Sequence, residues 1–219
     1  SATIQPDGSL AIGGCDVAEL AAEFGTPLFI YDETQLRARC REAVATFGLG
    51  NAVYATKAFL CTAMARLAYD EGMLLDVASG GELYVARRAG VPASAIVLHG
   101  NNKSIDELRM AITDGVRHIV VDSFDELDRL DALHAEGLPA PQVMARITPG
   151  LHAHTHEFIA TGQDDSKFGF NLANGSATKA IDRMRRSKSV QLRGVHCHIG
   201  SNVFEAANFA KAAEVMSGF

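Results

Sequence analysis

Short apolar runs alternate with longer segments of helical period along most of the chain. Six runs rich in Val, Ile and Leu stand out, at residues 52–56, 74–78, 95–98, 118–121, 143–147 and 192–195. Continuous apolar runs of this length are typical of strands that are buried on both faces. Because helical segments separate them, the pattern predicts parallel strands joined by helical crossovers.

The starts and ends of three helical segments carry a second pattern. A Ser-x-x-Glu sequence opens each of them, at 79–82, 104–107 and 123–126. In a capping box the serine oxygen accepts from the third backbone N–H, and the glutamate accepts from the backbone N–H of the serine. Glycine, which suits a left-handed helix end, follows all three segments, at Gly90, Gly115 and Gly137. The sequence therefore predicts a repeated strand-helix unit.

The amino-terminal part does not follow this rhythm. The apolar residues at 17–25 and 33–47 recur with the period of a helix, and an apolar run at 28–31 predicts a strand between these two segments. Before these, a Pro-Asp-Gly-Ser turn at 6–9 leads into a short strand-like run at 10–12. We expect the run at 10–12 to pair with a strand of another sheet and to lack partners without it.

Two architectures accommodate a series of parallel strand-helix units: a closed eight-stranded barrel and an open doubly wound sheet. A doubly wound nucleotide fold would carry a glycine-rich turn after its first strand, but here the first strong run continues into KAFLCTA at 57–63. The sequence therefore favours the barrel. About six strands are predicted where a closed barrel needs eight, so we expect an incomplete (β/α)8 TIM-type barrel in a chain that is part of a longer one.

Composition narrows the classes of function. Lys and Arg number 20 against 26 Asp and Glu, a formal net charge of -6. This argues against a nucleic-acid or membrane partner, because clustered positive charge binds such surfaces, and no apolar run approaches the roughly 18 residues of a membrane span. The sequence contains four cysteines but no CxxC pair: Cys15, Cys40, Cys61 and Cys197. We therefore expect free thiols in a reducing compartment, the cytoplasm.

Reactive side chains follow the predicted strands at their carboxyl ends, where parallel α/β folds place their chemistry. They are Lys57, Asp76, Ser79, His99, Asn101, Asn102, Asp122, Arg146, His196, His198 and Ser201. Because the carboxyl ends of parallel strands meet at one mouth, we expect these groups to converge there.

Lys57 directly follows a strand that is predicted to be buried, and a lysine rarely lies so deep without a partner or a task. One interpretation is structural: the ammonium reaches solvent at the strand end, or pairs with Asp76. The other is chemical, because a desolvated lysine amine is a nucleophile that forms a Schiff base. The residues alone leave both interpretations open.

Two histidine clusters raise the question of a metal ion. Strand alternation places His196 and His198 on one face and Cys197 on the other, so a zinc site that uses all three is geometrically poor. A two-histidine metal site remains an alternative. The cluster at 152–156 lies on a predicted loop, without a helix to set the i, i+4 geometry of a zinc protease. We interpret it as a polar loop, with a metal-dependent barrel hydrolase as the alternative.

Taken together, the motifs resemble the diaminopimelate decarboxylase family, which are pyridoxal-phosphate enzymes of the alanine-racemase-like barrel class. The resemblance rests on YATKA at 54–58, DVASGGE at 76–82, HGNNK at 99–103, HEFIATG at 156–162, DSKFG at 165–169 and HCHIGS at 196–201. It covers nearly the whole chain. Single motifs are shared with ornithine, arginine and carboxynorspermidine decarboxylases, but the set in this order is more specific.

The resemblance implies roles for particular residues. Lys57 would be the catalytic lysine that bonds pyridoxal 5'-phosphate as a Schiff base, with Asp76 near it. His198 would stack on the cofactor ring, Ser201 would contact the phosphate, and Arg146 would neighbour the cofactor. No metal is implied.

The resemblance also implies the organisation of the protein and its reaction. Residues 1–26 would be a leader and a strand of a second β-domain, and 27–219 the amino-terminal part of the cofactor-binding barrel. The family's glycine-rich phosphate loop, its Glu-Pro-Gly-Arg segment and most of the β-domain would follow. The expected function is decarboxylation of meso-diaminopimelate to L-lysine by a homodimer. The alternatives are a related ornithine, arginine or carboxynorspermidine decarboxylase, and a non-enzymatic pyridoxal-phosphate-binding barrel.

Overall fold

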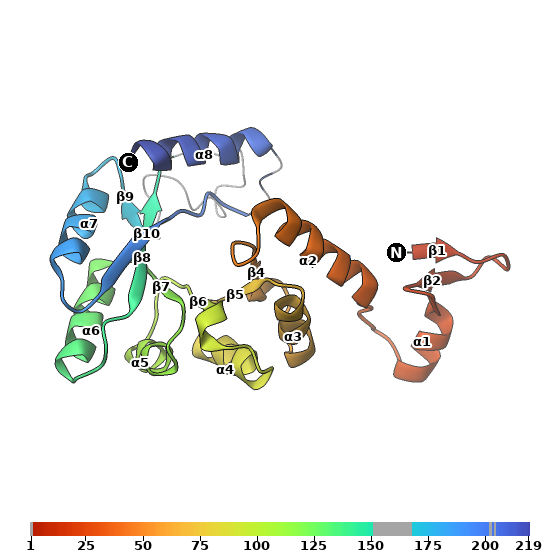
Figure 1. The fold of residues 1–219 in the computed structure, drawn as a ribbon. Helices are drawn as coiled ribbons and strands as arrows, with labels where there is room; N and C mark the ends of the chain where they lie inside the picture. Colours follow the sequence, from red (N-terminus) through yellow and green to blue (C-terminus); the bar gives the residue numbers. More distant parts are fainter. Residues whose placement is uncertain (1, 151–167, 202, 204) are drawn as a thin grey trace.

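Six parallel strands form the central sheet of the protein. The computed structural model describes residues 2–150, 168–201, 203 and 205–219 (Figure 1). The strands are β4 (Val53–Ala55), β5 (Leu74–Val77), β6 (Ile96–Leu98), β7 (His118–Val121), β8 (Gln142–Thr148) and β10 (Gln191–His196). They lie in the order β10-β8-β7-β6-β5-β4, and each neighbouring pair is parallel. All six predicted strands are therefore confirmed.

The helices cover the outer face of this curved sheet. They are α3 (Thr62–Asp70), α4 (Gly80–Arg88), α5 (Ile105–Asp114), α6 (Phe124–Ala135) and α7 (Ser176–Arg186), with α8 (Ala206–Gly218) last in the chain. Short 3-10 helices, η1 (Thr56–Ala58) and η2 (Ala93–Ala95), lie beside β4 and β6. The strand order follows the chain, and the helices α3 to α7 ring the strands in the same order (Figure 1). This is the incomplete (β/α)8 barrel that the pattern predicts.

The core lies between the sheet and these helices. Its largest fully buried side chains alternate between strands and helices and include Leu75, Leu83, Ile96, Leu98, Leu108 and Ile119. Burying one such side chain stabilises the fold by roughly 1.5–3 kcal/mol. The barrel side of the molecule therefore has its own apolar core, which fixes where each strand ends.

Helix caps confirm part of the predicted pattern. Each serine of the three Ser-x-x-Glu sequences accepts a hydrogen bond from the backbone N–H three residues on, at 3.2 Å in all three cases. Gly115 ends α5 in the left-handed conformation, at φ 74° and ψ 48°. Only α5 carries the complete capping box, between Ser104 and Glu107. The glutamates of α4 and α6 form different contacts, which are described with the site.

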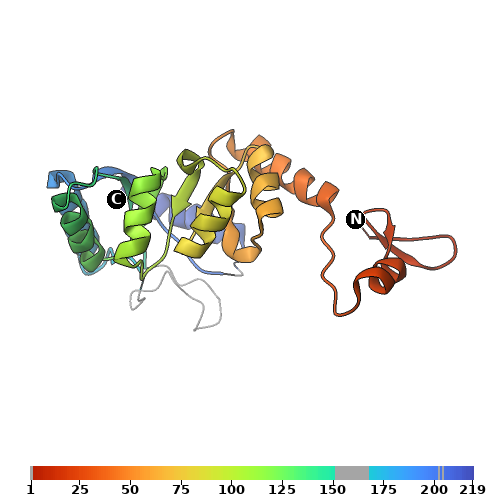
Figure 2. The ribbon, with the colours of Figure 1, turned by 90° about the horizontal axis from the view of Figure 1, so that it is seen from below.

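The amino-terminal segment is a separate small unit. Strands β1 (Ala2–Ile4), β2 (Leu10–Ile12) and β3 (Cys15–Asp16) form an antiparallel sheet, followed by α1 (Val17–Phe24). Figures 1 and 2 show this unit beyond the end of α2 (Glu33–Phe47), away from the parallel sheet. Both predicted helices are confirmed. The expectation that 10–12 would lack local partners is wrong, because a tight hairpin supplies β1 and β3.

The strand predicted at 28–31 is not formed. These residues form no helix or strand, and Phe29 is 85% exposed. A strand needs a neighbour for its backbone groups, and no described strand pairs with this segment. Conversely, the two-residue strand β9 (Phe170–Asn171), which pairs with β8, was not predicted because it is too short to show a period. No helix within the described ranges is both long and apolar enough to cross a membrane.

Candidate active site

A cavity of about 680 Å³ opens at the carboxyl ends of the strands. All five candidate site residues line it, and they come from four strand ends, with the last two both following β10: Lys57, Asp76, Arg146, His198 and Ser201. This volume suits a small molecule or cofactor, which commonly occupies 300–1,000 Å³. Nine of the eleven reactive groups expected at the mouth line this cavity, and Ser79 and Asp122 are not part of its lining.

Lys57 lies in η1, immediately after β4. Its side chain is exposed, which corrects the expectation of a deeply buried lysine. The physical reason is that β4 ends at Ala55, so the chain has turned out of the buried layer before Lys57. The side chain nevertheless belongs to the lining of the cavity, together with His198. The alternative in which Lys57 pairs with Asp76 is not observed among the described contacts, because Asp76 faces a histidine instead.

Asp76 ends in a small cluster with two histidines. Its Oδ2 lies 3.3 Å from Nδ1 of His99, and the His99 ring meets the His196 ring edge-on with centroids 4.5 Å apart. Three buried atoms of this cluster have no hydrogen-bond partner within the described structure: Asp76 Oδ1, His99 Nε2 and His196 Nδ1. Buried polar atoms are rarely left unpaired in native proteins. The cluster is therefore suited to receive polar atoms of a ligand.

The imidazole rings of His196 and His198 are uncharged at neutral pH. Burial, followed by the nearby charges of His99 and Arg146, lowers the pKa of His196 to about 3. Burial and then the charge of Lys57 lower the pKa of His198 to about 4. Both side chains line the cavity, as strand alternation predicted. A neutral, flat ring such as His198 is suited to stack against another flat ring.

Arg146 is held by two partners at the end of β8. Its guanidinium donates to Oδ1 of Asp122 at 3.0 Å and lies over the ring of Phe168, 4.5 Å from the centroid. The second carboxylate oxygen of Asp122 accepts from the backbone N–H of Gly169 at 3.0 Å. Gly169 has φ +71°, and a Cβ there would lie 2.7 Å from the Arg146 carbonyl oxygen. The close approach of these two segments therefore requires glycine.

The Ser-x-x-Glu glutamates link neighbouring strand ends around the mouth. Glu82 Oε2 accepts from the Ala78 N–H at 2.6 Å and lies 3.1 Å from Oγ1 of Thr56, which precedes Lys57. Glu107 Oε1 accepts from the Gly80 N–H at 2.8 Å. In each case the glutamate contacts the segment that follows the preceding strand of the sheet.

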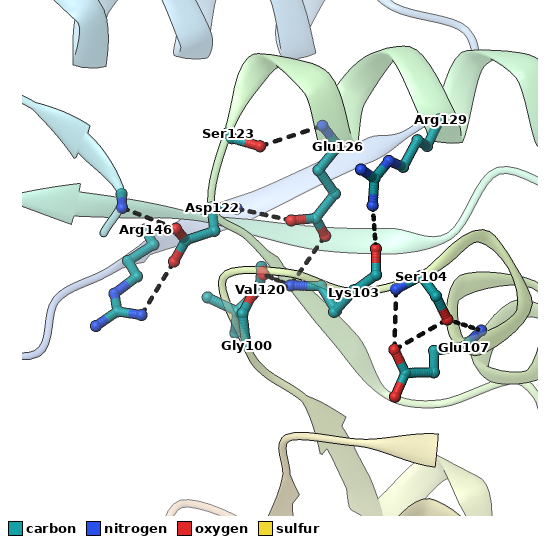
Figure 3. Close-up of polar contacts among 11 residues, drawn as sticks. Gly100, Lys103, Ser104, Glu107, Val120, Asp122, Ser123, Glu126, Arg129 and Arg146 are labelled. Carbon is teal, nitrogen blue, oxygen red and sulfur yellow. Dashed lines mark hydrogen bonds and ion pairs between the residues drawn. The ribbon is translucent and has the colours of Figure 1, made fainter. Parts of the chain in front are cut away.

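Glu126 repeats this arrangement with a charged partner. Its Oε2 accepts from the Asp122 N–H at 3.0 Å, and its Oε1 lies 3.0 Å from Nζ of Lys103 (Figure 3). The prediction of three capping boxes is therefore wrong for α4 and α6, because their glutamates bond the N–H that precedes the serine cap. The sequence pattern locates all three glutamates but does not reveal these partners.

Some of the other predicted residues lie in the described structure and some do not. His99 and Asn101 line the same cavity. The histidine cluster at 152–156, the HEFIATG segment and residues 165–167 lie outside the described residues. Phe168, Glu82 and Glu107 also line the cavity and were not predicted to do so. The contact between Lys103 and Glu126, which do not line it, was not predicted either. Both residues belong to motifs that the sequence shows, Lys103 to HGNNK and Glu126 to a Ser-x-x-Glu sequence. The motifs do not show that the two side chains contact each other.

Comparison with known proteins gives a consistent result. Residues 33–219 match the family model of the pyridoxal-dependent decarboxylase, pyridoxal binding domain. Among curated relatives, the diaminopimelate decarboxylase of Bacillus subtilis is 51% identical over 211 residues, which cover 94% of this chain and 48% of the relative. That of Mycobacterium tuberculosis is 49% identical over 212 residues, or 96% of this chain and 47% of the relative. The chain therefore spans about half the length of the curated relatives it matches.

Solved structures agree in fold. The diaminopimelate decarboxylase of M. jannaschii in complex with L-lysine aligns with a TM-score of 0.85 at 35% identity, over 100% of this chain and 52% of that one. The lysine/ornithine decarboxylase of Vibrio vulnificus with putrescine aligns with a TM-score of 0.70 at 22% identity, over 92% of this chain and 50% of that one. The second likeness shows a shared fold only.

Proposed function

Because this chain belongs to the family of pyridoxal-dependent decarboxylases, we propose that it is the cofactor-binding part of an enzyme that converts meso-diaminopimelate to L-lysine. The cofactor of the family is pyridoxal phosphate. In the reaction, the bond between one α-carbon and its carboxylate breaks, carbon dioxide leaves, and a proton takes its place on that carbon. Relatives at 49% and 51% identity carry this activity in their names and support the choice of substrate.

The residues of the cavity fit this cofactor. An exposed lysine amine, a serine hydroxyl, a guanidinium and a neutral imidazole line one space, at Lys57, Ser201, Arg146 and His198. The same space contains three buried polar atoms that lack partners in the described structure. A ligand with an aldehyde, a ring and an anionic group would engage this set. That one cavity gathers side chains from the ends of separate strands is the observation that carries the proposal.

Each residue then has a definite task. Lys57 binds the cofactor through its amine, and its exposure in the cavity leaves that amine accessible. His198 would stack on the cofactor ring, and its lowered pKa keeps the imidazole uncharged for that contact. Ser201 would contact the phosphate, Arg146 would neighbour the cofactor, and Asp76 would lie near Lys57 in the same cavity. These roles are part of the proposal.

The chemistry divides between cofactor and protein. When bound, pyridoxal phosphate supplies an electron sink for the electron pair that remains after carbon dioxide leaves. Nζ of Lys57 carries a proton to the carbon that lost its carboxylate. The strand ends fix the positions of these groups and thereby orient the bond that breaks.

The proposal extends to domain organisation, assembly and location. Residues 1–26 would belong to a second β-domain and 27–219 to the barrel, and the antiparallel unit beyond α2 supports this division (Figure 2). We further propose a homodimer in the cytoplasm. The four cysteines are free thiols, in keeping with a reducing compartment.

Two measurements on the complete gene product test the function. Borohydride reduction with bound cofactor, followed by peptide mass spectrometry, should place the label on Lys57, and a label on another lysine would remove the proposed mechanism. Carbon dioxide release should be fastest from meso-diaminopimelate in a panel with ornithine, arginine and carboxynorspermidine. Faster release from another member would reassign the substrate, whereas cofactor binding without release from any would favour a non-enzymatic barrel.

A further inference from the structure

Lys103 is a buried lysine that the proposed reaction does not use. Only 2% of the residue is exposed, at the end of the segment that follows β6. Its Nζ donates to the carbonyl oxygens of Gly100 at 2.5 Å and of Val120 at 2.8 Å, and it pairs with Glu126 at 3.0 Å (Figure 3). The ammonium thus donates two hydrogen bonds to backbone carbonyl oxygens and lies against a carboxylate oxygen as an ion pair. Lys103 therefore ties the end of β6 to the end of β7.

Glu126 extends this link toward the cavity. One carboxylate oxygen faces Lys103, and the other accepts from the backbone N–H of Asp122 at 3.0 Å. The carboxylate of Asp122 in turn holds the Arg146 guanidinium at 3.0 Å. A continuous series of polar contacts, two ion pairs joined through a backbone N–H, thus runs from Lys103 to Arg146, which lines the cavity (Figure 3).

The segment before Lys103 also reaches the cavity directly. Gly100, Asn101 and Asn102 all line it. Gly100 is closely packed: its φ is +116°, and a Cβ there would lie 3.2 Å from the Ala78 carbonyl oxygen. Because Lys103 Nζ bonds the Gly100 carbonyl, loss of the ammonium would release this segment as well.

Stability alone does not account for these charges. Lys103, Asp122, Glu126 and Arg146 are 2%, 3%, 4% and 5% exposed. Burying two ion pairs costs desolvation that their attraction roughly offsets, and apolar residues of similar size commonly serve folding equally well. Directed contacts do something that apolar packing does not: they set the direction of a guanidinium and the path of a backbone segment.

We propose that Lys103 and Glu126 are positioning residues for the cofactor pocket, which set Arg146 through Asp122 and set the Gly100–Asn102 segment through the Lys103 ammonium. This inference rests on the proposed function of the pocket. Neither residue touches the reacting atoms, and both act by fixing groups that do.

The test is a double variant, Lys103→Met with Glu126→Leu, in the complete gene product. It removes both buried charges together, so neither is left unpaired. Two readouts are compared with the wild type: the urea midpoint of the cofactor-free protein, and the Kd for pyridoxal phosphate with the absorbance spectrum of the bound form. We expect the urea midpoint to be largely retained while the Kd rises about tenfold or more. A loss of this size is typical when a residue that orients the ligand-binding side chains is removed.

A matched control is an exposed ion pair that links α5 to the end of α6. Arg109 of α5 and Glu136 at the end of α6 lie 2.6 Å apart, with side chains 40% and 52% exposed. Arg109→Met with Glu136→Leu should change neither Kd nor the spectrum, because this pair lies outside the cavity lining.

The outcomes separate the two proposals. A folded Lys103→Met, Glu126→Leu protein with wild-type Kd and spectrum overturns the positioning role and leaves the proposed function intact. A wild-type protein that binds no pyridoxal phosphate overturns the function and, with it, this inference. If the double variant does not fold, Glu126→Gln decides, since it keeps the side-chain shape: raised Kd supports positioning, and unchanged Kd overturns it.

Discussion

The two lysines of the cavity region show how differently neighbouring parts of the barrel mouth are built. Lys57, after β4, is exposed in the cavity, whereas Lys103, after β6, is 2% exposed and has three oxygen partners. A nucleophilic amine has to be reached by its ligand, so exposure within a cavity suits Lys57. The Lys103 ammonium is fixed by two carbonyl oxygens and an ion pair, so it suits a structural support. Burial after a strand is thus a poor guide to which lysine is reactive.

The largest expected effect is on catalysis. Lys57→Ala should lower carbon dioxide release by about a thousandfold or more, because the covalent attachment and the proton carrier are both lost. The urea midpoint should stay near the wild-type value, since the side chain is exposed. Steady-state assays with a parallel urea titration measure both, and near-normal turnover would contradict the assigned role.

The complementary change at the other lysine should act on stability first. Lys103→Ala leaves the Glu126 carboxylate buried without its ion-pair partner, and breaking a buried pair in this way costs about 3–5 kcal/mol. The free energy of unfolding from urea titration measures the loss. If Lys103→Ala lowered the free energy of unfolding no more than Lys57→Ala does, the contrast between a buried and an exposed lysine would be wrong.

A smaller effect is expected where the Arg146 side of the mouth meets Phe168 and Gly169. Gly169→Ala would place a Cβ 2.7 Å from the Arg146 carbonyl oxygen at φ +71°, at a cost of about 1–3 kcal/mol and with displacement of Arg146. Gly175 is the control, because it has φ +76° and nothing within 4 Å of a Cβ. Urea titration of both variants should show Gly175→Ala as the milder, and the reverse order would argue against close packing at Gly169.

The smallest effect concerns pH and the buried imidazole at the end of β10. Burial and the charges of His99, Arg146, His198 and Lys103 lower the pKa of His196 to about 3. The unfolded chain binds this proton near pH 6.5, so the native state loses stability as pH falls below that value toward 3.

Between pH 7 and pH 5.5 the loss due to this group should be about 1 kcal/mol. His196→Gln should lack that part of the slope while sharing the rest, as measured by urea titrations at both pH values. Parallel pH profiles of the two proteins would show that His196 is not buried in its neutral form.

Local sequence patterns determined most of the architecture. The six strands and the helices at 17–24 and 33–47 were predictable, because apolar period reports which face of an element is buried, and that information is local. The serine caps were predictable for the same reason, since a cap involves only residues within one turn. The run at 28–31 looked like a strand but lacks a partner, and a pairing partner is not local information.

The candidate site divides in the same way. Its reactive residues could be found in the sequence, because the carboxyl end of each parallel strand marks a place at the mouth. Which of them touch was decided only by the tertiary structure: Asp76 faces His99, Arg146 faces Asp122, and Glu126 reaches Lys103. Strand order and helix position bring together residues more than 20 positions apart, and the side chains then pair by charge and burial. The sequence by itself specified the elements and their chemical groups, whereas the packed barrel decided which amine is accessible and which is buried.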